Sequence, residues 1–598
     1  MRACFIAGLW FAVYLLAGRL PAQVQLYGGL TPAQQPDQAT NAPDAARVAV
    51  QGVVRNAATG EPLPRALVRI EGDADTGALT NGEGRFEIPG VPVGPQTFLV
   101  VKPGFRDRPY PTEEPGLQAD GPAHSVLVAA QMPDLVFTLT PNCAIHGRIE
   151  LSTGDPASGI TVTLLKRVVR FGRAVWAQET TARTNGDGAY RFGGLPGGVY
   201  ALYTLPALES EPAVNVVAPR SGTNVARSGY PSVFYPDARE FAGAARIRLS
   251  PGQQAEANFS LALEPFYAVT ALGLAQADGS AAGKTAPPGS YSATVMDASG
   301  HLLPYSAQYD DATHSLQANL PDGTYVLVVR GSPRDQFLAE FSYRLGKDSR
   351  RVGALAGSVQ FTVAGHAVAG LRVPLAAPIV NTVQFRMLHG AAGQAAATAA
   401  AGDDAGGIVT LSMDQADGIP QPGGDSIWSM DNGQDTIEFT AHPGVYWLSA
   451  YLPRRSMCAG PFTAAGLNLA RDPLALSLSA STPPMELTLR DDCATLALTL
   501  PGALAAFLPG EEPFYTVYVV PDFDTIEDVP PMTVHPSSGP TLTIDALTPG
   551  SYHVYTFDAP LHLEYRNPAV LAALPGSGQQ VTLSPGATSN LVLEVPGS

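Results

Sequence analysis

The feature that most constrains the fold of this chain is a pattern that recurs five times: a strand, a Pro-x-Gly turn, and a second strand that carries an aromatic residue near its start. Proline fixes φ at the turn, and glycine lets the chain reverse before the next strand, whose ring enters the core. The copies are spaced by roughly 100 to 125 residues, the size of one domain, which predicts five modules of one architecture. The copies are Val91-Pro92-Val93-Gly94 with Phe98, Leu195-Pro196-Gly197-Gly198 with Tyr200, Leu320-Pro321-Asp322-Gly323 with Tyr325, His442-Pro443-Gly444 with Tyr446, and Leu547-Thr548-Pro549-Gly550 with Tyr552.

A second motif, Asn-Gly-x-Gly, precedes the first two copies, at Asn81 and at Asn185. Its glycines supply positive-φ positions for a tight turn. The residues that follow alternate apolar and polar, which places Phe86 and Ile88 on one face of a strand. The motif therefore predicts a turn that enters a half-buried strand.

Composition supports an all-β chain. The 61 Gly and 54 Pro residues exceed what long helices tolerate, and an apolar fraction of 45% supplies material for several cores. The expected fold is a tandem array of about five β-sandwich domains. We place these five modules at residues 47–140, 141–264, 265–376, 377–490 and 491–598.

The N-terminus has the pattern of a secretory signal peptide, because Arg2 precedes an apolar run from Phe5 to Ala17 and small residues follow at Pro21 and Ala22. We expect cleavage after Ala22. Residues 23–46, rich in Gln, Pro and Ala, are expected to be a disordered linker. The protein is thus expected to be secreted, or to lie in the periplasm or cell envelope of a bacterium, with no membrane span after cleavage.

The first module resembles the carboxypeptidase regulatory-like family. The motifs that carry the resemblance are Gly52-x-Val54, Thr59-Gly60-x-Pro62-Leu63, Ala66-x-Val68, Asn81-Gly82-x-Gly84-x-Phe86 and the Pro-x-Gly strand lead. The resemblance extends over residues 47–105 and 143–203. Beyond them it is weak, and only the periodic recurrence of the motifs remains. It implies transthyretin-like, Ig-like sandwiches of about seven strands, grouped with carbohydrate-binding-like folds. The layout is similar to long secreted bacterial proteins made of such modules.

Three cysteines remain after signal cleavage, namely Cys143, Cys458 and Cys493, so at most one intramolecular disulfide forms in an oxidising compartment. Cys458 with Cys493 is the better pair, because both lie near strand ends of adjoining units and the loop between them is short. The alternative is three unpaired structural cysteines.

The sequence contains no pattern typical of a catalytic site. Zinc peptidases need clustered His and Glu ligands, and His146 with Glu150 or His562 with Glu564 lack a third ligand. Nucleophile-elbow and phosphate-loop motifs are missing as well. Acids such as Asp187, or Asp491 with Asp492, are interpreted as turn residues rather than calcium ligands. We therefore predict no catalytic residue, no metal and no cofactor.

Two aromatic groups are candidate ligand platforms. Tyr230, Phe234 and Tyr235 lie among prolines in one loop, where rings can stack on sugars. Trp428 and Trp447 belong to the fourth module. The alternative is that the loop rings plug a joint between strands or modules, and we favour this because Pro231 and Pro236 would pin the loop.

Two function classes follow. The first is a non-catalytic, monomeric scaffold that acts structurally or binds other envelope proteins, and the second is an array of carbohydrate-binding modules that recognise extracellular glycans. Nucleic acid is not expected as a partner, since the net charge is −17 and charged residues make up only 15%.

Overall fold

The computed structural model places the predicted modules in one compact unit that starts at Arg47. The predicted signal peptide, residues 1–22, and all but the last residue of the predicted linker, 23–46, lie outside the described residues. The structure describes residues 46–594 except 74–75, 107–122, 210–225, 275–288, 311, 334–354, 377–378, 391–408, 417, 421–425, 428–435, 440–442, 453–456, 478–481, 501–514, 527–528, 530–531, 535–540, 558–561, 575 and 577.

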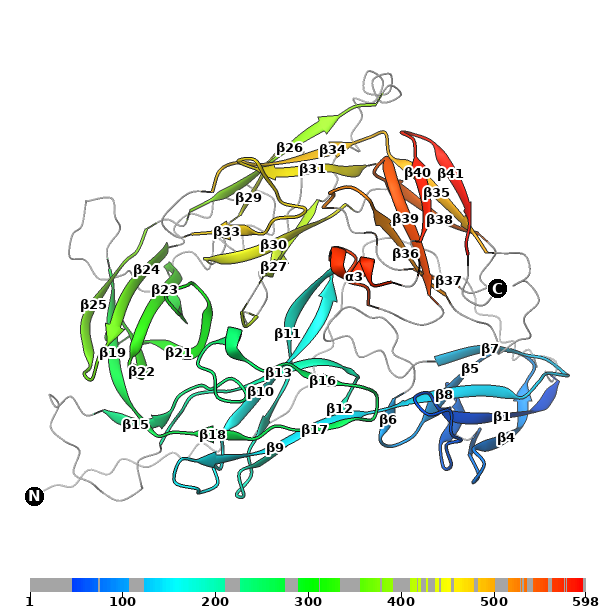
Figure 1. The fold of residues 1–598 in the computed structure, drawn as a ribbon, viewed down its shortest axis with the longest axis horizontal. Helices are drawn as coiled ribbons and strands as arrows, with labels where there is room; N and C mark the ends of the chain where they lie inside the picture. Colours follow the sequence, from blue (N-terminus) through cyan, green and yellow to red (C-terminus); the bar gives the residue numbers. More distant parts are fainter. Residues whose placement is uncertain are drawn as a thin grey trace, which may run out of the picture. The chain divides into compact units, whose positions relative to one another are not determined.

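Each module begins with a strand that has one antiparallel and one parallel neighbour (Figure 1). The antiparallel neighbour enters the Pro-x-Gly turn, and the parallel neighbour closes the module. This first sheet consists of β1 (Arg47–Asn56) with β4 (Arg85–Pro92) and β8 (Leu135–Pro141), β9 (Cys143–Leu151) with β12 (Ala189–Leu195), β17 (Gln254–Glu256) and β18 (Phe259–Leu261), β19 (Glu264–Leu274) with β22 (Ser315–Leu320) and β25 (Val368–Pro374), β26 (Asn381–Leu388) with β29 (Thr436–Phe439) and β34 (Met485–Arg490), and β35 (Ala494–Thr499) with β38 (Thr541–Leu547) and β41 (Thr588–Val592).

The second sheet of each module is antiparallel, and the strand that follows the Pro-x-Gly turn lies inside it. In spatial order its strands are β3 (Gly77–Leu79), β2 (Leu67–Ile70), β5 (Gly94–Val101) and β7 (Ala123–Val128); β11 (Arg173–Arg183), β10 (Thr161–Arg170), β13 (Gly198–Thr204) and β16 (Ile247–Leu249); β21 (Leu302–Asp310), β20 (Gly289–Met296), β23 (Gly323–Pro333) and β24 (Leu355–Val363); β28 (Ser426–Ile427), β27 (Thr410–Gln415), β30 (Gly444–Tyr451) and β33 (Leu474–Leu476); and β37 (Met532–Val534), β36 (Tyr515–Pro521), β39 (Gly550–Phe557) and β40 (Gln579–Leu583).

A few short elements complete the described chain. They are β6 (Phe105–Arg106), β14 (Ala207–Leu208), β15 (Arg227–Tyr230), the 3-10 turn η1 (Phe241–Gly243), β31 (Cys458–Ala464), β32 (Leu467–Asn468) and α3 (Pro568–Ala572). Within the described residues, no helix has the length and apolar character needed to cross a membrane. The predicted all-β class, a tandem array of sandwich-like modules, is confirmed.

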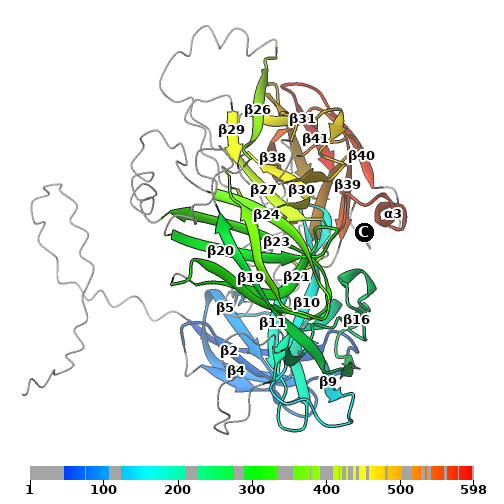
Figure 2. The ribbon, with the colours of Figure 1, turned by 90° about the vertical axis from the view of Figure 1, so that its left-hand side faces the viewer.

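The third module differs from the others because its two sheets are joined (Figure 2). β21 pairs with both β20 and β22, and Ala307 has a partner on each side, Ala293 and Ala318. A bridge between Ala356 and Ala376 brings β24 beside the end of β25. β15 of the segment assigned to the second module also pairs with β19. The sequence predicted two separate sheets here, and β21 joins them into one continuous set of paired strands.

Each predicted module contains its own hydrophobic cluster, which runs from Val50 to Leu139 in the first module and from Ala494 to Leu593 in the fifth. The aromatic residues of the repeated pattern are buried in these clusters, with exposed fractions of 5% or less. Each such ring contributes roughly 1.5–3 kcal/mol of transfer free energy. The five rings are Phe98, Tyr200, Tyr325, Tyr446 and Tyr552.

The tyrosines also fix the turn that precedes them. The Tyr200 hydroxyl donates to the carbonyl of Pro196 (2.7 Å), four residues earlier, and Tyr325 and Tyr552 make the same bond within their own turns at 2.9 and 2.6 Å. The ring therefore fills the core while its hydroxyl closes the turn. In the first module Gln96 occupies this place, and Phe98 lies two residues further along the same face.

The Asn-Gly-x-Gly motif forms the turn that the sequence predicts. Asn81 Oδ1 accepts from the backbone N–H groups of Glu83 (3.1 Å) and Arg85 (2.8 Å), and Asn185 is bonded in the same way. Only the second glycine of each motif has positive φ, 72° at Gly84 and 70° at Gly188. In the third module Asp297 makes bonds of the same pattern, but in the turn between β20 and β21 and not in the turn that enters β22.

Removing one turn-closing hydroxyl tests its contribution. Tyr200→Phe keeps the ring and leaves the Pro196 carbonyl without this donor, so we expect a loss of about 1 kcal/mol in the free energy of unfolding. Urea denaturation measures it, with Tyr230→Phe, which removes a bond to Glu209 near the surface, as the control. Equal midpoints for Tyr200→Phe and the unmodified chain would show that the hydroxyl does not hold the turn.

Candidate functional site

The aromatic loop that the sequence singled out packs against protein on most sides. Phe234 is 1% exposed, and its ring centroid lies 5.3 Å from that of Tyr203 and 5.8 Å from that of Phe241. Ile419, from the fourth module, belongs to the same buried cluster. Phe234 therefore fills a joint between the second and fourth modules. At this burial the Phe234 ring offers no open face on which a sugar could stack.

The other two rings of the loop are half-buried. Tyr235 packs edge-on against Phe259, with centroids 5.6 Å apart. The Tyr230 hydroxyl donates to Glu209 Oε1 at 3.2 Å. These contacts belong to the second module and its edge, so the three rings do not form one common surface.

The second predicted platform is also engaged in a protein contact. Trp428 lies outside the described residues. Trp447 lies on β30 next to the buried Tyr446 and points to the opposite face, as strand alternation requires. The Arg173 guanidinium of the second module lies 4.5 Å from the Trp447 ring centroid, a cation–π contact between modules.

Residues of three modules line a cavity of about 590 Å³ beside this contact. Arg173 comes from the second module, Trp447 and Arg471 from the fourth, and Asp522 and His553 from the fifth. The acids of the cavity have polar partners: Asp522 lies 2.6 Å from His553 Nδ1, and Asp524 accepts from Asn468 at 2.8 Å. The cavity thus combines aromatic rings with planar polar side chains.

Two ion pairs link these modules, and the first of them, Arg167 with Glu564, lines the cavity. Glu564 of the fifth module receives two hydrogen bonds from Arg167 of the second, one of them 2.8 Å long. Arg170 lies 3.2 Å from Asp414 of the fourth module. Burial raises the pKa of Asp414, and the neighbouring Arg170 opposes that rise. No sequence pattern relates these residues, because they lie hundreds of positions apart in the chain.

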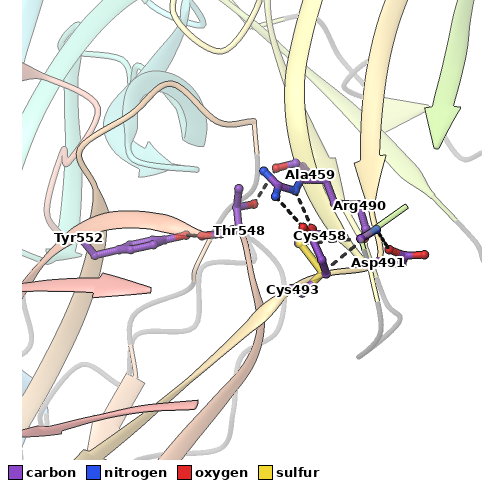
Figure 3. The surroundings of a disulfide bond; sticks show 9 residues. Cys458, Ala459, Arg490, Asp491, Cys493, Thr548 and Tyr552 are labelled. Carbon is purple, nitrogen blue, oxygen red and sulfur yellow. Dashed lines mark hydrogen bonds and ion pairs between the residues drawn. A yellow bond between two sulfur atoms is a disulfide. The ribbon is translucent and has the colours of Figure 1, made fainter. Parts of the chain in front are cut away.

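Cys458 and Cys493 form a disulfide, with Cα atoms 5.8 Å apart (Figure 3). The bond joins β31 of the fourth module to the residue before β35 of the fifth. Beside it, the Thr548 hydroxyl donates to the carbonyl of Ala459 (2.6 Å), which ties the fifth module's repeated turn to the fourth module. Cys143 is buried and unbridged, and its thiol donates to the Ser250 carbonyl.

The acids considered as calcium ligands are bonded to protein donors. Asp491 accepts from the backbone N–H of Gly390 and from His389, both at 2.8 Å. Arg490 donates to both oxygens of Asp492 and lowers the pKa of that carboxyl. Across the described parts of the chain, no three His, Cys, Asp or Glu side chains gather into a metal site.

The family comparison matches part of the chain. Residues 49–130 match the carboxypeptidase regulatory-like domain, the family that the sequence motifs of the first module resemble. The repeated motifs of that module are thus identified as those of this family. A search among curated proteins returned no match.

Solved structures with some similarity include pilins and other proteins of bacteria. The minor pilin GBS52 of Streptococcus agalactiae is 15% identical, with 36% of this chain and 95% of the pilin covered and a TM-score of 0.17. The Bacillus anthracis TIE protein is 11% identical, with coverages of 76% and 75% and a TM-score of 0.15. The major pilin BcpA of Bacillus cereus is 10% identical, with coverages of 58% and 99% and a TM-score of 0.14. Similarity this low assigns no function to the chain.

Loss of the disulfide should weaken the boundary between the fourth and fifth modules. Cys458→Ala with Cys493→Ala opens a loop of 35 residues, for which the chain-entropy model gives about 4 kcal/mol. We expect a lower urea midpoint, and a reductant should lower the midpoint of the unmodified chain but not that of the double variant. If the reductant left the urea midpoint of the unmodified chain unchanged, the disulfide would not stabilise this boundary.

Proposed function

We propose that this protein is a non-catalytic scaffold of the bacterial cell envelope or exterior, whose modules hold one another in a fixed arrangement and bind other envelope proteins. The observation that carries the proposal is that aromatic and arginine side chains of this protein contact neighbouring modules. Phe234, Trp447 and Arg173 all contact other modules of the same chain. In an array of carbohydrate-binding modules, by contrast, the aromatic rings would be exposed to solvent so that sugars could stack on them.

The joints between modules support the same function. Ile526 of the fifth module is fully buried in the core of the fourth, and the disulfide lies at the same boundary. Modules joined in this way transmit force and keep a fixed distance from one another, because movement of one module relative to the next would expose apolar surface. The predicted signal peptide supports export, and the family match of the first module supports a non-catalytic role.

A second candidate function is glycan binding, and the cavity beside Trp447 favours it over the aromatic loop. Its half-apolar wall, with Tyr555 and Phe523 near the Asp522–His553 pair, has the mixture of rings and planar polar groups that fits a saccharide. Under this function His553→Ala would abolish the binding of a sugar that the unmodified chain retains on a glycan array.

The variant Phe234→Ala tests the scaffold directly. The substitution leaves a cavity in the joint, and we expect it to cost about 3–5 kcal/mol of stability. A thermal melt measures the loss, with Tyr230→Ala, a partly exposed ring of the same loop, as the milder control. The scaffold also predicts that the unmodified chain binds no glycan on the array. An unchanged midpoint for Phe234→Ala would contradict the joint, and specific glycan binding would favour the second candidate.

A further inference from the structure

The β10–β11 hairpin of the second module extends beyond its own sheet. β10 and β11 pair along their whole length, from Thr161 opposite Arg183 to Arg170 opposite Arg173. The neighbouring strand β13 pairs with β10 only as far as Lys166. Among the described residues, the outer half of the hairpin therefore has no strand partner on that side, and its contacts lie with other modules.

The tip of the hairpin is a two-residue turn in which Phe171 and Gly172 both have positive φ, 48° and 70°. Such a turn fits the twist of a hairpin. Both carbonyls of the turn accept from Arg566 of the fifth module: Phe171 from the side chain at 3.0 Å, and Gly172 from the backbone N–H at 3.0 Å. One residue of the fifth module thus binds the whole turn.

Gly172 lies against the ring of Tyr565. A Cβ built on this glycine would meet ring atoms of Tyr565 at 2.5 Å, too close for any side chain. Tyr565 is 8% exposed, so it has little room to move away. The fit at this contact depends on the absence of a side chain at position 172.

The residue after the turn completes the contact with the fourth module. The Arg173 side chain is 9% exposed, donates to the carbonyl of Ala470, and lies over the ring of Trp447. Below the tip, Arg167 binds Glu564 and Arg170 binds Asp414. One hairpin therefore contacts both the fourth and the fifth module, at positions 244 to 397 residues away in sequence.

We propose that the Phe171–Gly172 turn is an intramolecular latch. Inserted, it holds the second module against the fourth and fifth and closes one wall of the cavity that the three modules line. Withdrawn, it releases these modules and opens the cavity. Arg167 is 38% exposed, so the ion pair with Glu564 is accessible to salt, and high ionic strength favours the withdrawn state.

Two glycine variants separate the latch from ordinary strain. Gly172→Ala and Gly154→Ala both place a side chain at positive φ in a turn of the same module, at 70° and 88°. A Cβ at position 154 meets nothing within 4 Å, whereas one at 172 meets Tyr565. We expect limited proteolysis of the folded chain to cleave the Gly172→Ala hairpin about tenfold faster, because cleavage follows the population of the open form. The radius of gyration in small-angle scattering should rise in the same variant. The Gly154→Ala chain should match the unmodified protein in both measurements.

Equal behaviour of the two glycine variants would overturn the proposal. If Gly172→Ala fails to fold, exchanging the charges of the Arg167–Glu564 ion pair tests the proposal instead. Arg167→Glu alone should release the hairpin, and Arg167→Glu with Glu564→Arg should restore the slow cleavage of the unmodified chain. A double variant that is cleaved as fast as the single one would show that this pair does not hold the latch.

Discussion

The constraint on which the described structure depends is the turn that leads from the first sheet of a module into the second. Proline and glycine set its backbone, the aromatic ring behind it fills the core, and in three modules the tyrosine hydroxyl bonds back to the turn at Pro196, Pro321 and Thr548. In these three modules one local interaction thus ties the turn to the core behind it. Because the turn recurs, one topology recurs, with a first strand between an antiparallel and a parallel neighbour.

This local constraint also places the contacts between modules. β13 follows the turn of the second module and fixes β10 beside it, and β10 carries the hairpin outward to Arg566 and Trp447. In the fifth module the turn residue Thr548 reaches the Ala459 carbonyl next to the disulfide. The same segment that builds a core therefore determines what each module presents to its neighbours.

The sequence was sufficient for the fold class and the local turns, because these follow from spacing, alternation and backbone preference. Asn81 and Asn185 make the bonds that their motif predicts, and the rings of the repeat are buried. One feature escaped it for a physical reason. The sheets of the third module are joined because Ala307 pairs with a strand on each side. The alternation of apolar and polar residues along a strand is the same whether the two sheets are separate or joined.

The candidate site was less predictable than the fold. A cluster of tyrosines and phenylalanines has the same composition in a sugar platform and in a joint, and only the burial of Phe234 separates the two. The Phe171–Gly172 turn packs against Tyr565 and Arg566, and no sequence pattern relates these two residues to it. Contacts between distant modules depend on the complementary shapes of their surfaces. The periodic pattern of apolar residues in the sequence does not predict such shapes.

The central claim is that the second, fourth and fifth modules form one fixed arrangement while the Phe171–Gly172 turn is inserted. A distance measurement by pulsed electron spin resonance tests it most directly, with labels at two exposed positions, Asp187 in the second module and Ser584 in the fifth. A rigid arrangement predicts a single narrow distance distribution in the unmodified chain. A broad distribution, as for independent domains on flexible connections, would contradict it.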